Sequence, residues 1–151
     1  MKTVQFRGLK IRVDRPKGFV QEGKDEEGHP WKRIYKYDYG FLPKTKGGDG
    51  EGIDVFVGPD ERANETYWVV QKKKDGSFDE YKVFAGFRSR AEAKKAYGDH
   101  IPMRYFGAMA AIPLEMMKAM LGIEPEEEKT ASIFGFFSEL EGIREAFGVP
   151  R

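Results

Sequence analysis

Hydrophobic and polar residues alternate along most of the first 87 positions of the chain. This alternation is typical of strands whose successive side chains point to opposite faces of a sheet. The segments that show it are 3–13 (one or two strands around Gly8), 19–22, 31–39, 53–57, 66–71 and 78–84. Turn-forming pairs such as Asp75-Gly76 separate neighbouring segments. Short strands joined by turns predict a small antiparallel β-barrel, closed or partly open.

The periodicity becomes helical near residue 88. Ser89-Arg90-Ala91-Glu92 is a capping box, which predicts a helix over 91–97. A strand at 108–112 follows, and Pro113 then begins a short helix that ends at Gly122. A last helix, with an aromatic stripe, is expected from about Thr130 to Phe147. The C-terminal helices are therefore expected to pack on the barrel.

The length of 151 residues suits one domain with a proper hydrophobic core. We expect an α+β fold of a single domain over 1–151, β-rich in 1–87 and helical in 88–151.

The composition narrows the classes of function. The chain has 26 Lys and Arg against 25 Asp and Glu, which argues against a protein dedicated to nucleic acid or acidic membranes. It has no cysteine, and we interpret the two histidines, His29 and His100, as solvated turn residues, so a zinc site is not expected. No apolar run has the length of a membrane span, and the N-terminus lacks the apolar core of a signal peptide. We therefore expect a cytoplasmic location.

A glycine-rich acidic loop lies between the strands at 31–39 and 53–57. It places Asp49, Glu51 and Asp54 within six residues, and Asp54 interrupts an apolar strand. Carboxylates this close repel one another unless a cation lies among them, and a charge in an apolar strand needs a partner. Oxygen ligands without histidine favour Mg²⁺ or Mn²⁺. The alternative is a solvated acidic turn.

Two further groups carry candidate chemistry. Asp75, Glu80 and Lys82 follow one another in the hairpin of 66–84, where the alternative is an ordinary charged hairpin. Arg33 and Tyr39 share one face of the predicted strand 31–39 with other aromatic residues, and this face either lines a site or packs tyrosines.

These motifs together resemble the signature of the family I soluble inorganic pyrophosphatases. Residues 39–43 match its aromatic-Gly-aromatic-x-Pro segment, and 49–54 match its Asp-Gly-Asp-Pro-x-Asp segment with Glu51 and Gly52 as departures. Asp75, Glu80 and Lys82 reproduce its later spacing. The segments FVGP (56–59) and FDEYKVFAGF (78–87) resemble those of the small pyrophosphatase-like domains of phages and prophages.

The resemblance implies an OB-like, pyrophosphatase-type barrel and assigns roles to its matched residues. The implied metal ligands, for Mg²⁺ or alternatively Mn²⁺, are Asp49, Asp54, Asp75 and Glu80. Glu51 would be the base, next to Asp54, Tyr39 and Lys82 as further catalytic residues. The substrate-binding candidates are Arg33, Tyr39, Lys82, Lys24 and Arg104.

The expected function is Mg²⁺-dependent hydrolysis of pyrophosphate to two phosphates. One alternative is hydrolysis of another phosphoanhydride or a nucleotide, and another is a non-catalytic phage structural or binding module. The expected partners are pyrophosphate or a related phosphoanhydride and, as one option, a second copy bound through the C-terminal helix. Neither a specific nucleic acid nor a membrane is expected. The location would be the host cytoplasm if the gene belongs to a phage.

Overall fold

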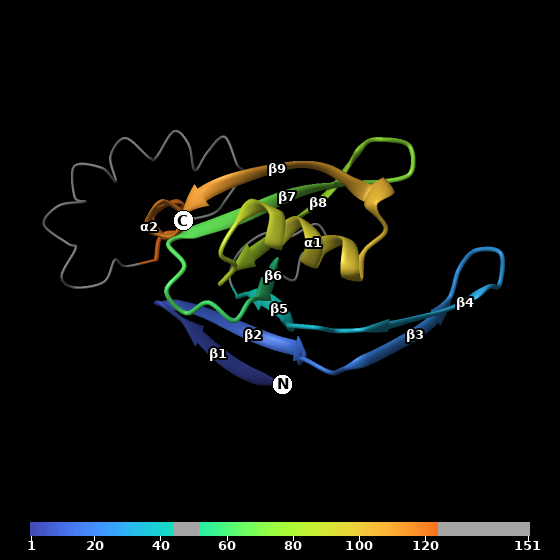
Figure 1. Cartoon of the computed structure of the whole chain (residues 1–151), viewed down its shortest axis with the longest axis horizontal. Coiled ribbons are helices and arrows are strands. Elements are labelled where there is room, and N and C mark those ends of the chain that lie inside the picture. Colours follow the sequence, from blue (N-terminus) through green and yellow to red (C-terminus); the bar gives the residue numbers. More distant parts are fainter. Residues whose placement is uncertain (44–51, 124–151) are drawn as a thin grey trace, which may run out of the picture.

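The computed structural model describes residues 1–43 and 52–123 (Figure 1). Its strands are β1 (Lys2–Phe6), β2 (Leu9–Arg15), β3 (Val20–Lys24), β4 (Pro30–Ile34), β5 (Asp38–Leu42), β6 (Ile53–Val57), β7 (Glu65–Lys72), β8 (Phe78–Ala85) and β9 (Phe106–Pro113). Its helices are α1 (Arg90–His100), a 3₁₀ turn (Met103–Tyr105) and α2 (Leu114–Met120). The last predicted helix, and with it the proposed contact to a second copy, lies outside the described residues.

Seven strands form one sheet in the order β1-β2-β5-β6-β8-β7-β9. All neighbours in it are antiparallel except β6 and β8, which are parallel. β7 does not pair with β6 but lies one position further out in the sheet. β8 runs antiparallel to β7 and fills the place between them, so it is parallel to β6. In the described ranges, β1 and β9 remain the two edges of the sheet. The expected antiparallel pairing thus fails at one pair, and within the described residues the sheet does not close into a barrel.

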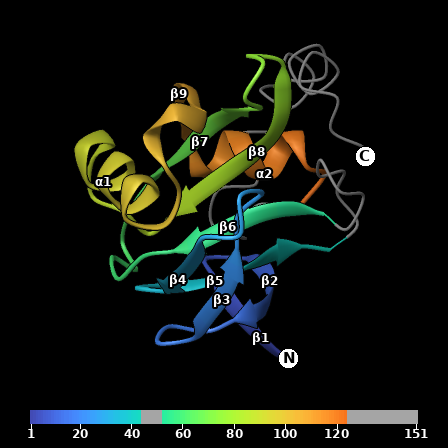
Figure 2. The same ribbon diagram turned by 90° about the vertical axis from the view of Figure 1, so that its right-hand side faces the viewer.

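The curved sheet carries a hydrophobic core on each face. One core joins β1 and β2 to α2, and its fully buried members include Leu9, Ile11, Val55, Val83 and Met117. The other lies beneath α1, and its members include Tyr35, Phe56, Phe84, Phe87 and Tyr97. The two helices therefore cover different faces (Figure 2).

The helix signals in the sequence are confirmed. Ser89 Oγ accepts the backbone N–H of Glu92 at 3.1 Å, and α1 continues to His100. α2 begins directly after Pro113 and packs on β7 and β9, as expected for a helix covering the barrel. β9 confirms the expected strand near 108–112 within the otherwise helical C-terminal part. No helix of the described residues is both long and apolar enough to cross a membrane.

The predicted strand over 31–39 is in fact two strands in different sheets. β4 pairs with β3 in a separate two-stranded ribbon, whereas β5 pairs with β2 and β6. Between them lies Tyr35, whose side chain is 1% exposed and anchors the base of the ribbon in the core. In Figure 1 the ribbon reaches away from β2 and β5 toward the same end of the molecule as the β7–β8 turn. The alternation of residue types continued through this break although β4 is mostly exposed on both faces, so the pattern did not reflect burial there.

Candidate functional site

Four of the residues predicted from the sequence meet on three adjacent strands. Tyr39 lies on β5, Asp54 on β6, and Glu80 and Lys82 two residues apart on β8. Asp54 stands beside Lys82 in the parallel register of β6 and β8. Side chains two positions apart share a face of a strand, so Glu80 and Lys82 point to the same side of the sheet.

Lys82 joins the four side chains. Its Nζ donates to Asp54 Oδ2 at 2.7 Å, to Glu80 Oε1 at 2.8 Å and to Tyr39 Oη at 2.6 Å. Tyr39 Oη in turn donates to Asp54 Oδ2 at 2.5 Å. An ammonium has three protons to donate, and this geometry uses all of them.

The pKa values of Tyr39, Glu80 and Lys82 are shifted by burial and by the neighbouring charges. Burial raises the pKa of the Glu80 carboxyl, Asp54 adds to the rise, and Lys82 opposes it. Burial also favours the neutral amine of Lys82, but Asp54 and Glu80 outweigh that effect and raise its pKa. Burial and the Asp54 carboxylate raise the pKa of Tyr39 far above its usual value, so its hydroxyl remains a donor.

A cavity of about 240 Å³, here called the inner cavity, opens over Tyr39 and Lys82. It combines cationic, hydroxyl and amide groups with aromatic walls. The residues that line it are Arg15, Arg33, Tyr35, Tyr39, Phe56, Gln71, Lys82, Ile101, Pro102 and Tyr105. Guanidinium and ammonium groups facing one small space can hold an anion with several oxygens. The structure thus brings Arg33 together with Tyr39 and Lys82, as the sequence predicted.

Arg15 enters the inner cavity through an irregularity that the sequence does not reveal. The register of β2 against β5 shifts between Val13 and Arg15, which places Arg15 opposite Tyr39. A bulge of this kind re-aims the side chain that follows it. Gly40 permits the close approach of the two strands, because a Cβ at this position would lie 1.9 Å from the Arg12 carbonyl oxygen.

Tyr35 orients both guanidinium groups. Its hydroxyl accepts Nη1 of Arg15 at 2.9 Å and Nη1 of Arg33 at 3.3 Å, and donates to Gln21 Oε1 at 2.8 Å. The ring is buried against Tyr39, Phe56 and other members of the core beneath α1. The two arginines are therefore positioned by a rigid group before any anion binds.

Gln71 is a second cavity residue that the sequence analysis missed. Its Nε2 donates to Asp79 Oδ2 at 2.9 Å, and its Oε1 accepts the Tyr97 hydroxyl at 2.8 Å. These bonds connect β7, β8 and α1 behind the cavity. The sequence shows only a polar residue at the end of an apolar strand, and the structure adds that this residue is buried.

The remaining candidates lie elsewhere. Asp75 lies in the β7–β8 turn, fully exposed, where its Oδ1 accepts the backbone N–H and the hydroxyl of Ser77. These bonds lower the pKa of Asp75, and none joins it to Asp54 or Glu80. Lys24 ends β3 beside the exposed Trp31. Asp49 and Glu51 lie outside the described residues.

The interpretation of His100 as a solvated turn residue was wrong. It ends α1 and is 4% exposed, because the ring packs against Tyr35 and Phe56. His29, in contrast, lies exposed at the tip of the β3–β4 ribbon, as expected.

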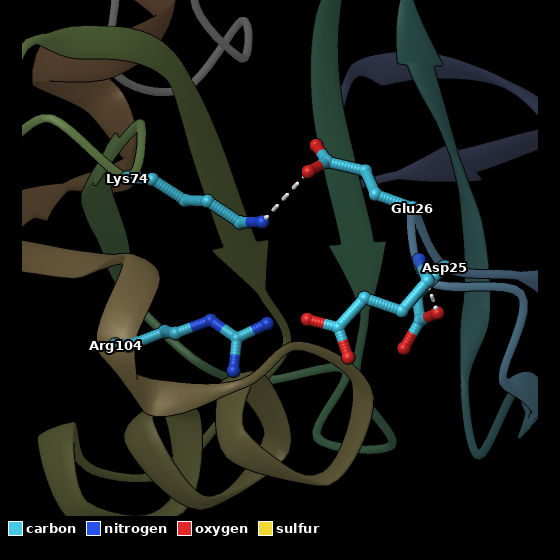
Figure 3. Close-up of a pocket in the computed structure, with 5 residues that line it drawn as sticks. Asp25, Glu26, Lys74 and Arg104 are labelled. Atoms are coloured by element: carbon cyan, nitrogen blue, oxygen red, sulfur yellow. Dashed lines mark hydrogen bonds and ion pairs between the residues drawn. The ribbon is translucent and has the colours of Figure 1, made fainter.

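Arg104 lies at a separate charged cavity of about 450 Å³ at the ribbon tip (Figure 3). Asp25, Glu26 and Glu27 line one side, and Lys74 and Arg104 line the other. Lys74 Nζ lies 3.4 Å from Glu26 Oε2, and Figure 3 shows these two side chains pointing at each other. Acids and bases compensate one another here, so this cavity has the character of a contact between the ribbon tip and the β7–β8 turn.

The central cluster contains two carboxylates, the type of ligand that Mg²⁺ prefers. Residues 1–43 and 52–123 contain no group of three or more acidic or histidine side chains arranged around a metal position. Asp54 and Glu80 present two carboxylates to one point, which the Lys82 ammonium occupies. Mg²⁺ is commonly held by one or two carboxylates together with water and substrate phosphates, so two suffice.

Comparisons with known proteins give the chain a family. A family model described as Inorganic Pyrophosphatase matches residues 1–122, which include every described residue of the central cluster. A solved structure of an inorganic phosphatase from Anaplasma phagocytophilum is similar at 21% identity, covering 87% of this chain and 75% of that chain, with a TM-score of 0.30. No curated protein matches the sequence significantly.

Proposed function

The chain belongs to the inorganic pyrophosphatase family, and we propose that it hydrolyses pyrophosphate to two phosphates in the presence of Mg²⁺. One observation carries the proposal: Tyr39 and Lys82, which bond to the carboxylates of Asp54 and Glu80, line a cavity whose wall also holds two oriented guanidinium groups. Such an arrangement places two carboxylates directly behind the donors that face the cavity.

The roles follow from the chemistry of each group. Asp54 and Glu80 would hold the cation, together with Asp49 as suggested by the sequence, whereas Asp75 lies apart from them in the exposed β7–β8 turn. When bound, the cation would offset phosphate charge and acidify the attacking water. Arg15 and Arg33 would bind phosphate oxygens. Lys82 and the Tyr39 hydroxyl would each do so by exchanging one of their present hydrogen bonds within the cluster for one to phosphate. Glu51 remains our candidate for the base.

Water does not attack pyrophosphate readily because the anion carries several negative charges. Donors fixed in advance stabilise the extra charge of the transition state without having to reorganise. A non-catalytic module would have no use for a lysine buried between two carboxylates, since such a group costs desolvation free energy. We place the reaction in the cytoplasm, that of the host if the gene belongs to a phage.

The test is phosphate release from pyrophosphate by the full chain at saturating Mg²⁺. Asp54→Asn removes the charge at the centre of the cluster and is expected to lower kcat by ~10²-fold or more. Glu61→Gln, an exposed acid in the turn after β6, is the matched control and should retain the parental rate. Equal rates for Asp54→Asn and the parent protein would contradict the proposed site.

A further inference from the structure

A second and larger cavity lies beside the inner cavity. This outer cleft of about 720 Å³ lies between the β3–β4 ribbon, the end of α1 and the 3₁₀ turn. Arg33, Pro102 and Tyr105 line both spaces, so the two cavities meet at these side chains. A ligand can therefore extend from one space into the other.

The size of the outer cleft exceeds what pyrophosphate requires. Sites for molecules of cofactor or drug size have volumes of ~300–1,000 Å³. The outer cleft falls in this range, whereas the inner cavity of about 240 Å³ lies below it. Pyrophosphate bound in the inner cavity would leave the outer cleft unused.

The walls of the outer cleft are aromatic and cationic. Trp31 is 38% exposed, and the Arg33 guanidinium lies 5.6 Å from the centre of its ring. On the other wall the Arg104 guanidinium lies 4.9 Å from the centre of the Tyr105 ring. Exposed aromatic rings and guanidinium planes are the surfaces on which proteins stack nucleic acid bases.

The orientation of Trp31 is set by its neighbour across the ribbon. Trp31 pairs with Gly23, and a Cβ on Gly23 would come within 2.5 Å of the indole ring. The ring therefore lies directly over the glycine backbone. Because the indole ring packs on the Gly23 backbone, its exposed aromatic surface is already held in place before a ligand binds.

The charge of the outer cleft favours an anionic ligand. Four cations line it, Lys32, Arg33, Lys36 and Arg104, against two acids. Asp99 is paired with Lys36 at 3.3 Å and with Lys95 at 3.0 Å. Asp25 Oδ1 accepts two backbone N–H groups of its own turn, and its Oδ2 lies 3.4 Å from His29 Nδ1. Lys32, Arg33 and Arg104 therefore supply the excess positive charge.

We propose that the outer cleft binds the nucleoside of a nucleoside 5′-triphosphate while its two terminal phosphoryl groups occupy the inner cavity. This inference rests on the proposed function, because the terminal pair takes the place of pyrophosphate. The bond cleaved is then the anhydride between the β and γ phosphoryls. The water oxygen bonds to the γ phosphorus, the bridging oxygen leaves with the nucleoside diphosphate, and one proton is released as inorganic phosphate forms.

The first experiment compares pyrophosphate, inorganic tripolyphosphate, ATP and GTP as substrates of the full chain in Mg²⁺. Trp31→Ala removes the stacking surface and is expected to lower kcat/KM for both nucleotides about tenfold, mainly through KM, because a base stacked on one aromatic ring contributes ~1–3 kcal/mol. Hydrolysis of pyrophosphate and tripolyphosphate, which carry no base, should change less than twofold. Phe78→Ala, an exposed aromatic residue outside both cavities, is the matched control.

The second experiment measures binding without turnover. Trp68 is buried and Trp31 is half exposed, so a β,γ-methylene nucleotide should quench mainly Trp31 fluorescence. The quench should persist in Phe78→Ala and vanish in Trp31→Ala. A parent protein that hydrolyses pyrophosphate but shows neither quenching nor nucleotide turnover overturns this inference and leaves the proposed function intact. Failure to hydrolyse pyrophosphate, with the Trp31-dependent quench present, rejects the proposed function and supports the nucleoside cleft.

Discussion

His100 illustrates how one residue can couple stability to pH. Its Nε2 accepts the backbone N–H of Lys36 at 3.0 Å, which requires that Nδ1 carry the proton and donate to the Ala96 carbonyl oxygen at 2.6 Å. A second proton on Nε2 would face the N–H group of Lys36. Burial, together with the positive charges of Arg33 and Lys36, accordingly lowers the pKa of His100 below its usual 6.5, against the opposing effects of Ala96 and Asp99.

This arrangement predicts a loss of stability in mild acid. As the pH falls below about 6.5, the unfolded chain binds a proton at this position that the folded chain resists, so the unfolded state is favoured. We expect His100→Gln to be less stable than the parent by ~1–3 kcal/mol at pH 7.5, through its disturbed buried hydrogen bonds. The difference should shrink by pH 5.5, because only the parent loses the histidine contribution. Urea unfolding at both pH values measures it, with His29→Gln as the exposed control. A gap that stays constant between the two pH values would refute the linkage.

At the scale of elements, the β3–β4 ribbon is attached to the rest of the molecule at its two ends. At the base, the backbone of Tyr35 bonds to Gly18 and Phe19, and its ring enters the core. At the tip, the pair formed by Lys74 and Glu26 is exposed on both sides, with side chains 61% and 87% exposed. Within the described residues, the ribbon strands pair only with each other. The base therefore holds the ribbon more strongly than the tip does.

We accordingly expect ribbon amides to exchange with deuterium faster than those of β6, which lies at the centre of the large sheet. Removing the tip contact with Lys74→Gln should accelerate exchange in 20–34 by no more than about fivefold, since exposed ion pairs contribute ~0–1 kcal/mol. Hydrogen exchange followed by mass spectrometry resolves both segments. Lys73→Gln removes a charge from the same turn without an ion pair to the ribbon and serves as the control. Ribbon amides as slow as those of β6 would show that the ribbon is held along its whole length.

Over the whole molecule, positive and negative charges nearly cancel, but the central cluster holds two carboxylates close together. The net charge is +1, yet Asp54 and Glu80 lie together, partly buried, and Lys82 offsets only one of them. A ligand cation that completes this balance should bind the folded chain in preference to the unfolded chain. Binding to the folded state alone stabilises it by RT ln(1 + [L]/Kd), ~2.7 kcal/mol at a hundredfold excess over Kd.

Millimolar Mg²⁺ should therefore raise the melting temperature of the parent protein by several degrees, whereas NaCl at equal ionic strength should not. Asp54→Asn should lose this response, and Glu61→Gln should retain it. Differential scanning calorimetry provides the comparison. The same melting temperature in both salts for the parent protein would count against a cation site in the cluster.

The local features of this protein were determined by its sequence. Alternation places Glu80 and Lys82 on one face of β8, and Asp54 stands out as a charge within an apolar strand. The capping box at Ser89 and the start of α2 after Pro113 also follow from neighbouring residues. Each of these depends on backbone geometry over a few positions, which the order of residue types specifies directly.

Only the tertiary structure decided which of these local features meet. Asp54 contacts Lys82 because β6 and β8 pair side by side in the sheet, although β7 lies between them in the sequence. Arg15 reaches the cavity because β2 has a bulge where it pairs with β5. The break of 31–39 at Tyr35 and the burial of His100 at the end of α1 depend equally on contacts between distant segments. Such contacts are selected by the packing of two cores and by closely approaching backbones, which no short window of sequence contains.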